Sequence, residues 1–316
     1  MTKRFIGTRQ TTLASEIVLT GKGVHSGEVA SVILHPADAD SGLRFLVTRH
    51  GDVVADLPAD HTLVVDATLC TVLGDGRGNT VSTVEHLLAA LRGLGIDNAT
   101  IEIDSAEIPI MDGSSAPFVA AIDECGIREL DAARRFIKVL KPIRVQDGCC
   151  WGELSPGAGF SVDVEIDFST PLIGRQRLNL DLTPSIFRQE LARARTFGFM
   201  RDVEKLWAAG RALGASLDNT VAIADDKVVN PSGLRYINEF VRHKTLDAIG
   251  DLALSGLPLQ GAYRSSRGGH RLNTMVLQAL FADRSAWTVT QGSTYRDYGH
   301  AGMSFGLPAT YAPDKT

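Results

Sequence analysis

Cysteines are scarce in this sequence, and their spacing argues against a fold held together by disulfides. Among 316 residues there are four cysteines, and two of them, Cys149 and Cys150, are adjacent. Domains that depend on disulfides carry many more cysteines for their length, and neighbouring cysteines make a poor framework. We therefore expect a protein of a reducing compartment, most simply the cytoplasm.

Long apolar runs and clusters of basic residues are missing as well. No apolar stretch approaches the roughly 20 residues of a membrane span, and Glu16 and Lys22 interrupt the apolar residues near the N-terminus. We expect neither a membrane span nor a signal peptide. The net charge is −5 without a basic stripe, so no nucleic-acid partner is expected. The content of 44% apolar and 22% charged residues is typical of a globular enzyme.

The length favours two domains. A chain of 316 residues is long for one hydrophobic core, and the charged, glycine-free stretch Leu130–Arg135 divides it. We place the domains at residues 1–132 and 133–316. Both halves mix short alternating strands with helices, which indicates the α+β class. Val84–Leu91 also resembles Val241–Ala248, as two packed copies of one unit would.

The most informative stretch is Phe240–Asp251, which we predict to be helical because no glycine or proline interrupts it before Gly250. His243 and Asp247 lie four residues apart and so share one face of that helix. An imidazole and a carboxylate at this spacing can bind one divalent metal ion. The alternative is a solvated His–Asp pair, worth only a few tenths of a kcal/mol. A metal site would need a further ligand from elsewhere.

A second predicted helix, over residues 81–93, offers that ligand. Ser82 is expected to cap it, with Glu85 three residues later in a capping box. His86 follows at once and aligns with His243 in the internal repeat. If His86 bound a metal, Glu85 could reach a water molecule on it and act as general base. The alternative is that Glu85 only caps the helix.

Four other segments carry expectations that the structure can test. His25 lies between glycines in a tight, exposed loop, where a histidine is usually a surface residue. Pro184–Arg195 reads as one helix, and Val203–Leu213 as an amphipathic helix. Arg267–His270 is expected to be a flexible loop, and the chain after Val289 is expected to be poorly ordered.

Four motifs together resemble a known enzyme family. They are Thr83–Leu91, Glu107–Ser114, Arg195–Asp202 and Phe240–Asp251. With them the chain resembles UDP-3-O-acyl-N-acetylglucosamine deacetylases, the zinc hydrolases of lipid A synthesis in Gram-negative bacteria, over about residues 21–280. The resemblance implies two similar domains, each a β-sheet layer packed on a helix layer. These form a β-α-α-β sandwich with the active site at the domain interface.

The resemblance also implies the catalytic centre. His86, His243 and Asp247 would bind one zinc ion and leave its fourth position to water, although Fe²⁺ could use the same ligands in the cell. Glu85 would take the proton of that water. His270 would be protonated, stabilise the oxyanion and donate a proton to the leaving amine.

The remaining roles follow from the resemblance. Asp251 would pair with His270 and favour its charged form, Thr196 would bind the oxyanion, and Lys244 would hold the polar end of the substrate. That substrate is a UDP-linked acylated amino sugar. Phe197 and the segment Val203–Leu213 would line the passage for its acyl chain.

One match to the family and one departure from it concern substrate binding. Phe168 corresponds to an aromatic residue that stacks on uracil, but Cys150 replaces a lysine found in many members, so a diphosphate contact would be missing or supplied by Arg267. We expect a monomer. One alternative is a catalytically silent UDP-sugar-binding relative, which would have lost part of the catalytic set. Another is structural zinc, which usually has four ligands including cysteine.

Overall fold

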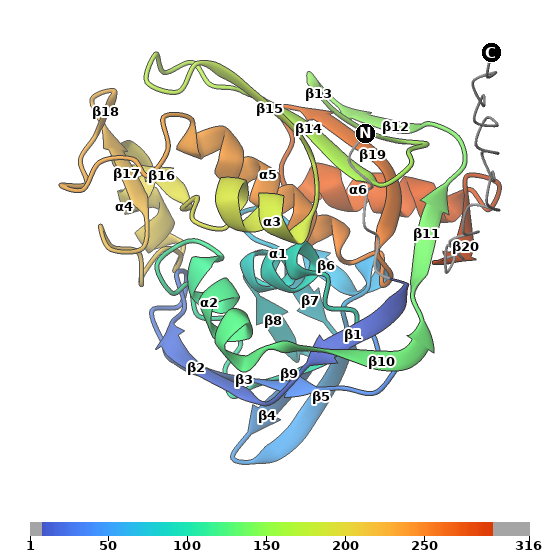
Figure 1. Ribbon diagram of the computed structural model, residues 1–316. Helices are drawn as coiled ribbons and strands as arrows, with labels where there is room; N and C mark the ends of the chain where they lie inside the picture. The colour runs from blue at the N-terminus through green and yellow to red at the C-terminus, as the bar shows by residue number, and fades with distance from the viewer. Residues whose placement is uncertain (1–7, 293–316) are drawn as a thin grey trace, which may run out of the picture.

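The computed structural model describes residues 8–292, and these form a mixed α+β fold. Figure 1 shows two sheet regions, one above and one below, with helices α1 and α5 between them. The α+β class is therefore confirmed. Among the described helices, none is long and apolar enough to cross a membrane.

The lower sheet has five strands in the order β2-β3-β9-β4-β5. Its strands alternate inward and outward; Val32 and Leu34 of β3 are fully buried, while Ile33 between them is partly exposed. Such alternation is expected of a sheet that covers a core with one face. The strands are Ile17–Lys22 (β2), Val29–Pro36 (β3), Leu43–Arg49 (β4), Asp52–Pro58 (β5) and Ala99–Ile103 (β9).

Short strands complete this half. A second sheet has the order β6-β7-β8, and a two-stranded sheet pairs β1 with β10. A short 3-10 helix, η1 (His61–Leu63), precedes β6. The strands are Arg9–Leu13 (β1), Val64–Asp66 (β6), Val72–Gly74 (β7), Thr80–Ser82 (β8) and Ile127–Ala133 (β10).

The upper sheet contains seven strands around β19. Strand β19 pairs with β13 on one side and with β14 and β11 at different parts of its length, and β20 closes the sheet beside β11. The strands are Arg135–Val139 (β11), Ile143–Asp147 (β12), Cys150–Ser155 (β13), Phe160–Asp167 (β14), Arg175–Asp181 (β15), Leu259–Ser266 (β19) and Trp287–Gln291 (β20).

Four long helices lie against these sheets. They are Glu85–Leu94 (α1), Ala116–Cys125 (α2), Glu239–Leu252 (α5) and His270–Ala282 (α6). All ten residues of α1 are buried, and α1 ends where Gly95 takes a left-handed conformation (φ 85°). A Cβ atom on Gly250 would lie 2.0 Å from the carbonyl oxygen of Glu85, so α5 approaches α1 closely only because glycine stands there.

A smaller unit projects at the left of Figure 1. It comprises the sheet β16-β17-β18 and helix α4. Its elements are Phe197–Phe199 (β16), Met200–Ala208 (α4), Val221–Ala224 (β17) and Lys227–Val228 (β18). The amphipathic helix predicted over residues 203–213 therefore exists, but it begins and ends earlier.

Two helix predictions were wrong in detail. Ser82 does not cap α1: it belongs to β8, and α1 begins only at Glu85 without a side-chain cap. The helix predicted over residues 184–195 is a short turn, Pro184–Ile186 (α3), followed by the π-helical segment Phe187–Leu191 (η2). At the other end of the chain, β20 continues past Val289 to Gln291, and residues 293–316 lie outside the described part.

Candidate active site

The three expected metal ligands converge between α1 and α5. Nε2 of His86 lies 3.5 Å from Oδ1 of Asp247, and Nε2 of His243 lies 3.2 Å from the same oxygen. One candidate ligand atom from each residue lies within 4.8 Å of the others, and all three side chains are buried. Two residues from α5 and one from α1 thus form the cluster that the sequence predicted.

This donor set fits a divalent metal ion. Oδ1 of Asp247 is buried, and no described residue donates a hydrogen bond to it. Its other oxygen, Oδ2, accepts a hydrogen bond from the ammonium group of Lys244 at 2.8 Å. Nδ1 of His243 lies 3.1 Å from the carbonyl oxygen of Ala194. A donated bond there would leave Nε2 free as a ligand atom, which is the usual arrangement around metal-binding histidines.

Burial and charge set the protonation of these candidate ligands. Burial lowers the pKa of His243 to about 4, so the ring is neutral at physiological pH. Burial alone would raise the pKa of Asp247, but His243 and Lys244 outweigh it and hold this pKa well below its usual value. A neutral imidazole and an ionised carboxylate are the forms that bind metal ions.

Glu85 lies beside the cluster, at the first position of α1. Its Oε2 accepts a hydrogen bond from the backbone N–H of Thr71 at 3.1 Å, and its Oε1 lies 3.9 Å from Nε2 of His270. Desolvation raises the pKa of this carboxyl group above its ordinary value. A carboxylate with raised pKa is a stronger proton acceptor, as a general base must be.

His270 is held by a buried network that the sequence showed only in part. Its Nδ1 lies 2.9 Å from Oδ2 of Asp251, the pairing expected from the family resemblance. Asp251 also accepts hydrogen bonds from Oγ1 of Thr71 (2.6 Å) and Nδ2 of Asn273 (2.7 Å), and Asn273 is bonded in turn to Tyr263. Thr71, Asn273 and Tyr263 have no motif of their own, so sequence analysis missed them.

The expected loop at His270 is shorter than predicted, because it spans Arg267–Gly269 and does not include His270. His270 is the first residue of α6 and is only 8% exposed. Burial would lower its pKa, but the carboxylates of Asp251 and Glu85 outweigh burial and raise it to about 9. The imidazolium form is therefore favoured at neutral pH, as a proton donor requires.

The cluster opens into a cavity of about 630 Å³. Glu85, His86, Lys244 and His270 line one part of it, together with Thr196. Helix α4 contributes another part, which is apolar: Met200, Val203, Leu206 and Trp207. Trp207 is 56% exposed, an unusual state for so large an apolar side chain.

Aromatic rings link the two parts of the cavity. Phe197 packs edge-on against His243 (ring centres 6.3 Å apart) and against Phe240 (5.0 Å). Phe168 packs against Phe197 at 5.7 Å and against Phe199 at 6.2 Å. Both aromatic residues that the resemblance assigned to substrate binding line this cavity.

A buried ion pair fixes the segment next to Thr196. Nε of Arg195 lies 2.9 Å from Oε1 of Glu239, and the two side chains are 4% and 0% exposed. Glu239 also accepts bonds from the backbone N–H groups of Arg195 and Arg235. Because His243 contacts the carbonyl oxygen of Ala194, this ion pair also supports the orientation of a candidate metal ligand.

Arg267 is not among the residues that line the cavity. It is paired with Asp167, and its Nη1 donates to the sulfur of Cys149 at 3.6 Å. Cys150, which replaces a lysine of the family pattern, is the first residue of β13. A contact of Arg267 with a diphosphate therefore stays a prediction.

His25 lies in the cavity wall, although its sequence context favoured a surface residue. The buried carboxylate of Glu107 accepts hydrogen bonds from the backbone N–H groups of His25 and Ser26, each at 2.8 Å. It also accepts one from Oγ1 of Thr83 at 3.0 Å. Glu107 belongs to one of the family motifs, and this was the available signal that the His25 loop lies at the site.

Comparison with known proteins agrees with the motifs. Residues 10–282 match the sequence model of the family described as LpxC, UDP-3-O-acyl N-acetylglycosamine deacetylase. Two curated relatives, from Brucella ovis and Brucella canis, are each 52% identical to this chain over 285 residues. Both are named UDP-3-O-acyl-N-acetylglucosamine deacetylase, and the alignments cover 89% of this chain and 98% of each relative.

Proposed function

Because this chain belongs to the UDP-3-O-acyl N-acetylglycosamine deacetylase family, we propose that it hydrolyses the N-acetyl group of UDP-3-O-acyl-N-acetylglucosamine. The products are acetate and the free amine, an intermediate of lipid A synthesis. The observation that carries the proposal is the convergence of five residues at one end of an apolar cavity: Glu85, His86, His243, Asp247 and His270. A catalytically silent relative has no need of the complete set.

His86, His243 and Asp247 are the proposed ligands of one zinc ion. Three protein ligands are typical of catalytic zinc, whereas structural sites have four. When bound, zinc polarises a carbonyl group and makes a coordinated water more acidic. Lys244 keeps one oxygen of Asp247 occupied, so that the other faces the two histidines. Fe²⁺ fits the same nitrogen and oxygen donors.

Glu85 and His270 divide the proton transfers. Glu85 takes a proton from the attacking water as its oxygen bonds to the acetyl carbon. Imidazolium His270, hydrogen-bonded through Nδ1 to Asp251, has Nε2 available for the substrate. That nitrogen first stabilises the oxyanion, together with Thr196, and then donates its proton to the amine when the C–N bond breaks.

The apolar part of the cavity accounts for the acyl chain. Phe197 and the exposed apolar face of α4 (Met200–Ala208) would contact it, since an exposed apolar face of this kind is typical of a binding site for an apolar ligand. Phe168 is the proposed stacking partner of uracil and Arg267 the proposed diphosphate contact. Lys244 would bind the polar end of the sugar.

Strand pairing supports the proposed domains, residues 1–132 and 133–316, to within one residue, since Ala133 still pairs with Arg9. Strand β10 pairs with β1 of the first half, whereas β11, which begins two residues later, pairs with β19 and β20 of the second. The site would then lie at the interface of a β-α-α-β sandwich, because α1 and α5 come from different halves.

The test is to measure bound metal and acetate release together. We expect one zinc ion per wild-type chain and acetate release from the UDP-acyl-sugar. His86→Ala and His243→Ala should lose both. His35→Ala is the matched control, since His35 pairs with Glu16 and Glu102 outside the cavity. Glu85→Ala should keep the metal and lose turnover; a wild-type protein with metal but without turnover would instead support a silent binding protein.

A further inference from the structure

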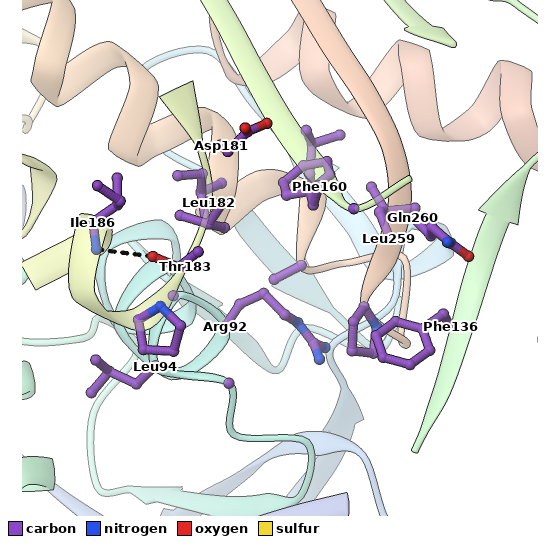
Figure 2. Close-up of a pocket in the computed structure, with 18 of the residues that line it drawn as sticks. Arg92, Leu94, Phe136, Phe160, Asp181, Leu182, Thr183, Ile186, Leu259 and Gln260 are labelled. Carbon is purple, nitrogen blue, oxygen red and sulfur yellow. Dashed lines mark hydrogen bonds between the residues drawn. The ribbon is translucent and has the colours of Figure 1, made fainter. Parts of the chain in front are cut away.

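A second, larger cavity lies at the other end of the α1–α5 pair. Its volume is about 1110 Å³, and of the described residues none lines both cavities. Arg92 of α1 belongs to this second cavity and follows Glu85 by seven residues, which is roughly 10 Å along a helix. Figure 2 shows residues of α1, β11, β15, α3 and β19 around one space.

The walls are mainly apolar. Phe136, Phe160, Leu182, Ile186 and Leu259 surround the space in Figure 2. Phe136 and Leu259 are buried, and the other three are partly exposed. Small-molecule sites are typically concave, mostly apolar and of roughly 300–1,000 Å³, with a few polar groups that orient the ligand. This cavity has that composition and about that size.

Arg92 is its principal polar group and has few partners. The residue is 9% exposed, and among residues 8–292 neither Nε nor Nη1 has a hydrogen-bond partner. Nη2 donates to the carbonyl oxygen of Gly256 at 3.3 Å, and Nη1 lies 3.8 Å from Oδ1 of Asp97, too far for a hydrogen bond. Burial lowers the pKa of Arg92 to about 10, so the group is charged at neutral pH.

The local charges do not balance. Asp97 is already engaged by Arg134, whose Nε lies 2.9 Å from its Oδ1. Arg134 also lines the cavity. One buried carboxylate thus faces two guanidinium groups, which leaves one positive charge. Asp181 lines the cavity too, but it is exposed and its carboxylate points away from Arg92 in Figure 2. A buried cation without a full partner is costly, and a bound anion relieves that cost.

We propose that this cavity binds a small amphiphile whose single anionic head group pairs with Arg92 and whose apolar body contacts Phe136, Leu182 and Leu259. A carboxylate or a phosphate head supplies the same chemistry, because guanidinium binds either through two hydrogen bonds. Rotation of the Arg92 side chain brings its unpaired nitrogens to the head group. The proposal does not depend on the deacetylase reaction.

The test compares three ten-carbon probes on the zinc-loaded full chain by calorimetric titration below their micelle concentrations. Decanoate and decyl phosphate carry the anionic head, and decanol is the neutral control. We expect at least one anionic probe to bind about tenfold or more tightly than decanol. The tighter of the two identifies the head group.

Variants locate the binding. Arg92→Met should weaken the anionic probe about tenfold without unfolding the protein, since replacing an under-paired buried ion with an apolar side chain is often neutral or stabilising. Leu182→Trp should exclude the probe by filling the cavity. Arg188→Met is the matched control, because Arg188 pairs with Asp123 and lines neither cavity. It should bind the probe as wild type does.

A photoreactive decanoate separates this cavity from the catalytic one. We expect its label on residues 180–186 or 259–260. Label confined to Phe197–Phe199 or Met200–Ala208 would place the probe in the catalytic cavity and overturn the proposal. Equal affinity for decanol and both anions, or unchanged binding by Arg92→Met, would overturn it as well.

Discussion

The protonation of His270 offers a direct test of the catalytic network. Asp251 accepts the hydrogen bond from Nδ1 of His270, and Asp251 with Glu85 raises the pKa of His270 from 6.5 to about 9. That rise equals roughly 3 kcal/mol in favour of the charged ring. The perturbation is Asp251→Asn, which keeps the size of the side chain and removes its charge.

Without that charge, burial lowers the pKa of His270 again, against the remaining carboxylate of Glu85, and this pKa should return to about 6.5. The proposed reaction needs the protonated ring, so activity of the variant should be lost at lower pH than in the wild type. At pH 8 a ring with a pKa of 9 is mostly protonated, whereas one with a pKa of 6.5 is protonated in about 3% of molecules. We therefore expect about a thirtyfold loss of kcat at pH 8 but less than about twofold at pH 6.

The assay is acetate release between pH 5.5 and 9.5 with zinc-loaded protein, alongside NMR titration of labelled His270. Wild type and variant hold the same metal, so their difference reports the charge of Asp251. Asp163→Asn is the control, because Asp163 is 8% exposed and pairs with Arg177 on the upper sheet. Its pH profile should match the wild type. An equal loss at pH 6 and pH 8 in Asp251→Asn would refute the reasoning.

Three further substitutions test the α1–α5 contact, the specificity for the acyl chain and the buried ion pair of Arg195 with Glu239. Gly250→Ala places a Cβ atom 2.0 Å from the carbonyl oxygen of Glu85, so it should cost about 1–3 kcal/mol and weaken zinc binding, measured by Tm and metal titration. Leu206→Glu should raise the KM for substrates with long acyl chains, with little change in Tm. The control is Lys205→Glu, which should leave this KM unchanged because Lys205 does not line the cavity. Equal effects of the two substitutions would place the acyl chain elsewhere. Glu239→Ala strands a buried arginine and should destabilise the fold by about 3–5 kcal/mol in urea unfolding.

Local patterns pointed to the proposed metal ligands because these residues lie on regular helices. His243 and Asp247 are four residues apart, and an α-helix brings such residues to one face without help from the rest of the chain. The internal repeat then indicated His86 as the partner. Each step depended on helical periodicity, the most reliable signal in a sequence.

The start of α1 could not be predicted in this way. Ser82 and Glu85 have the spacing of a capping box, but Ser82 is paired in β8 and its carbonyl oxygen accepts a bond from Ile108. Thr83 then takes a left-handed conformation (φ 58°), which is strained for a β-branched residue, and its hydroxyl group binds Glu107. Contacts distant in sequence therefore override the local signal.

The partners of His270 and the second cavity share this limitation. Thr71 and Asn273 reach Asp251 from separate elements, 180 and 22 residues away, so no spacing rule connects them. Arg92 belongs to a helix that is buried throughout, and its sequence context shows nothing of the missing partner. The partners of His270 and the surroundings of Arg92 both depend on contacts between residues distant in sequence, which are known only from the fold.

Close packing of α1 against α5 explains why one helix pair can serve two different cavities. Gly250 lets the helices touch beside Glu85, which brings His86 within reach of Asp247. Beyond that contact, Gly93 allows Phe187 to lie against α1, where a Cβ atom would be only 2.4 Å from the ring. The ring of Phe187 thus fills the space directly beside Gly93. The polar cluster at one end and Arg92 at the other are separated by tightly packed residues, so ligands at the two sites need not compete.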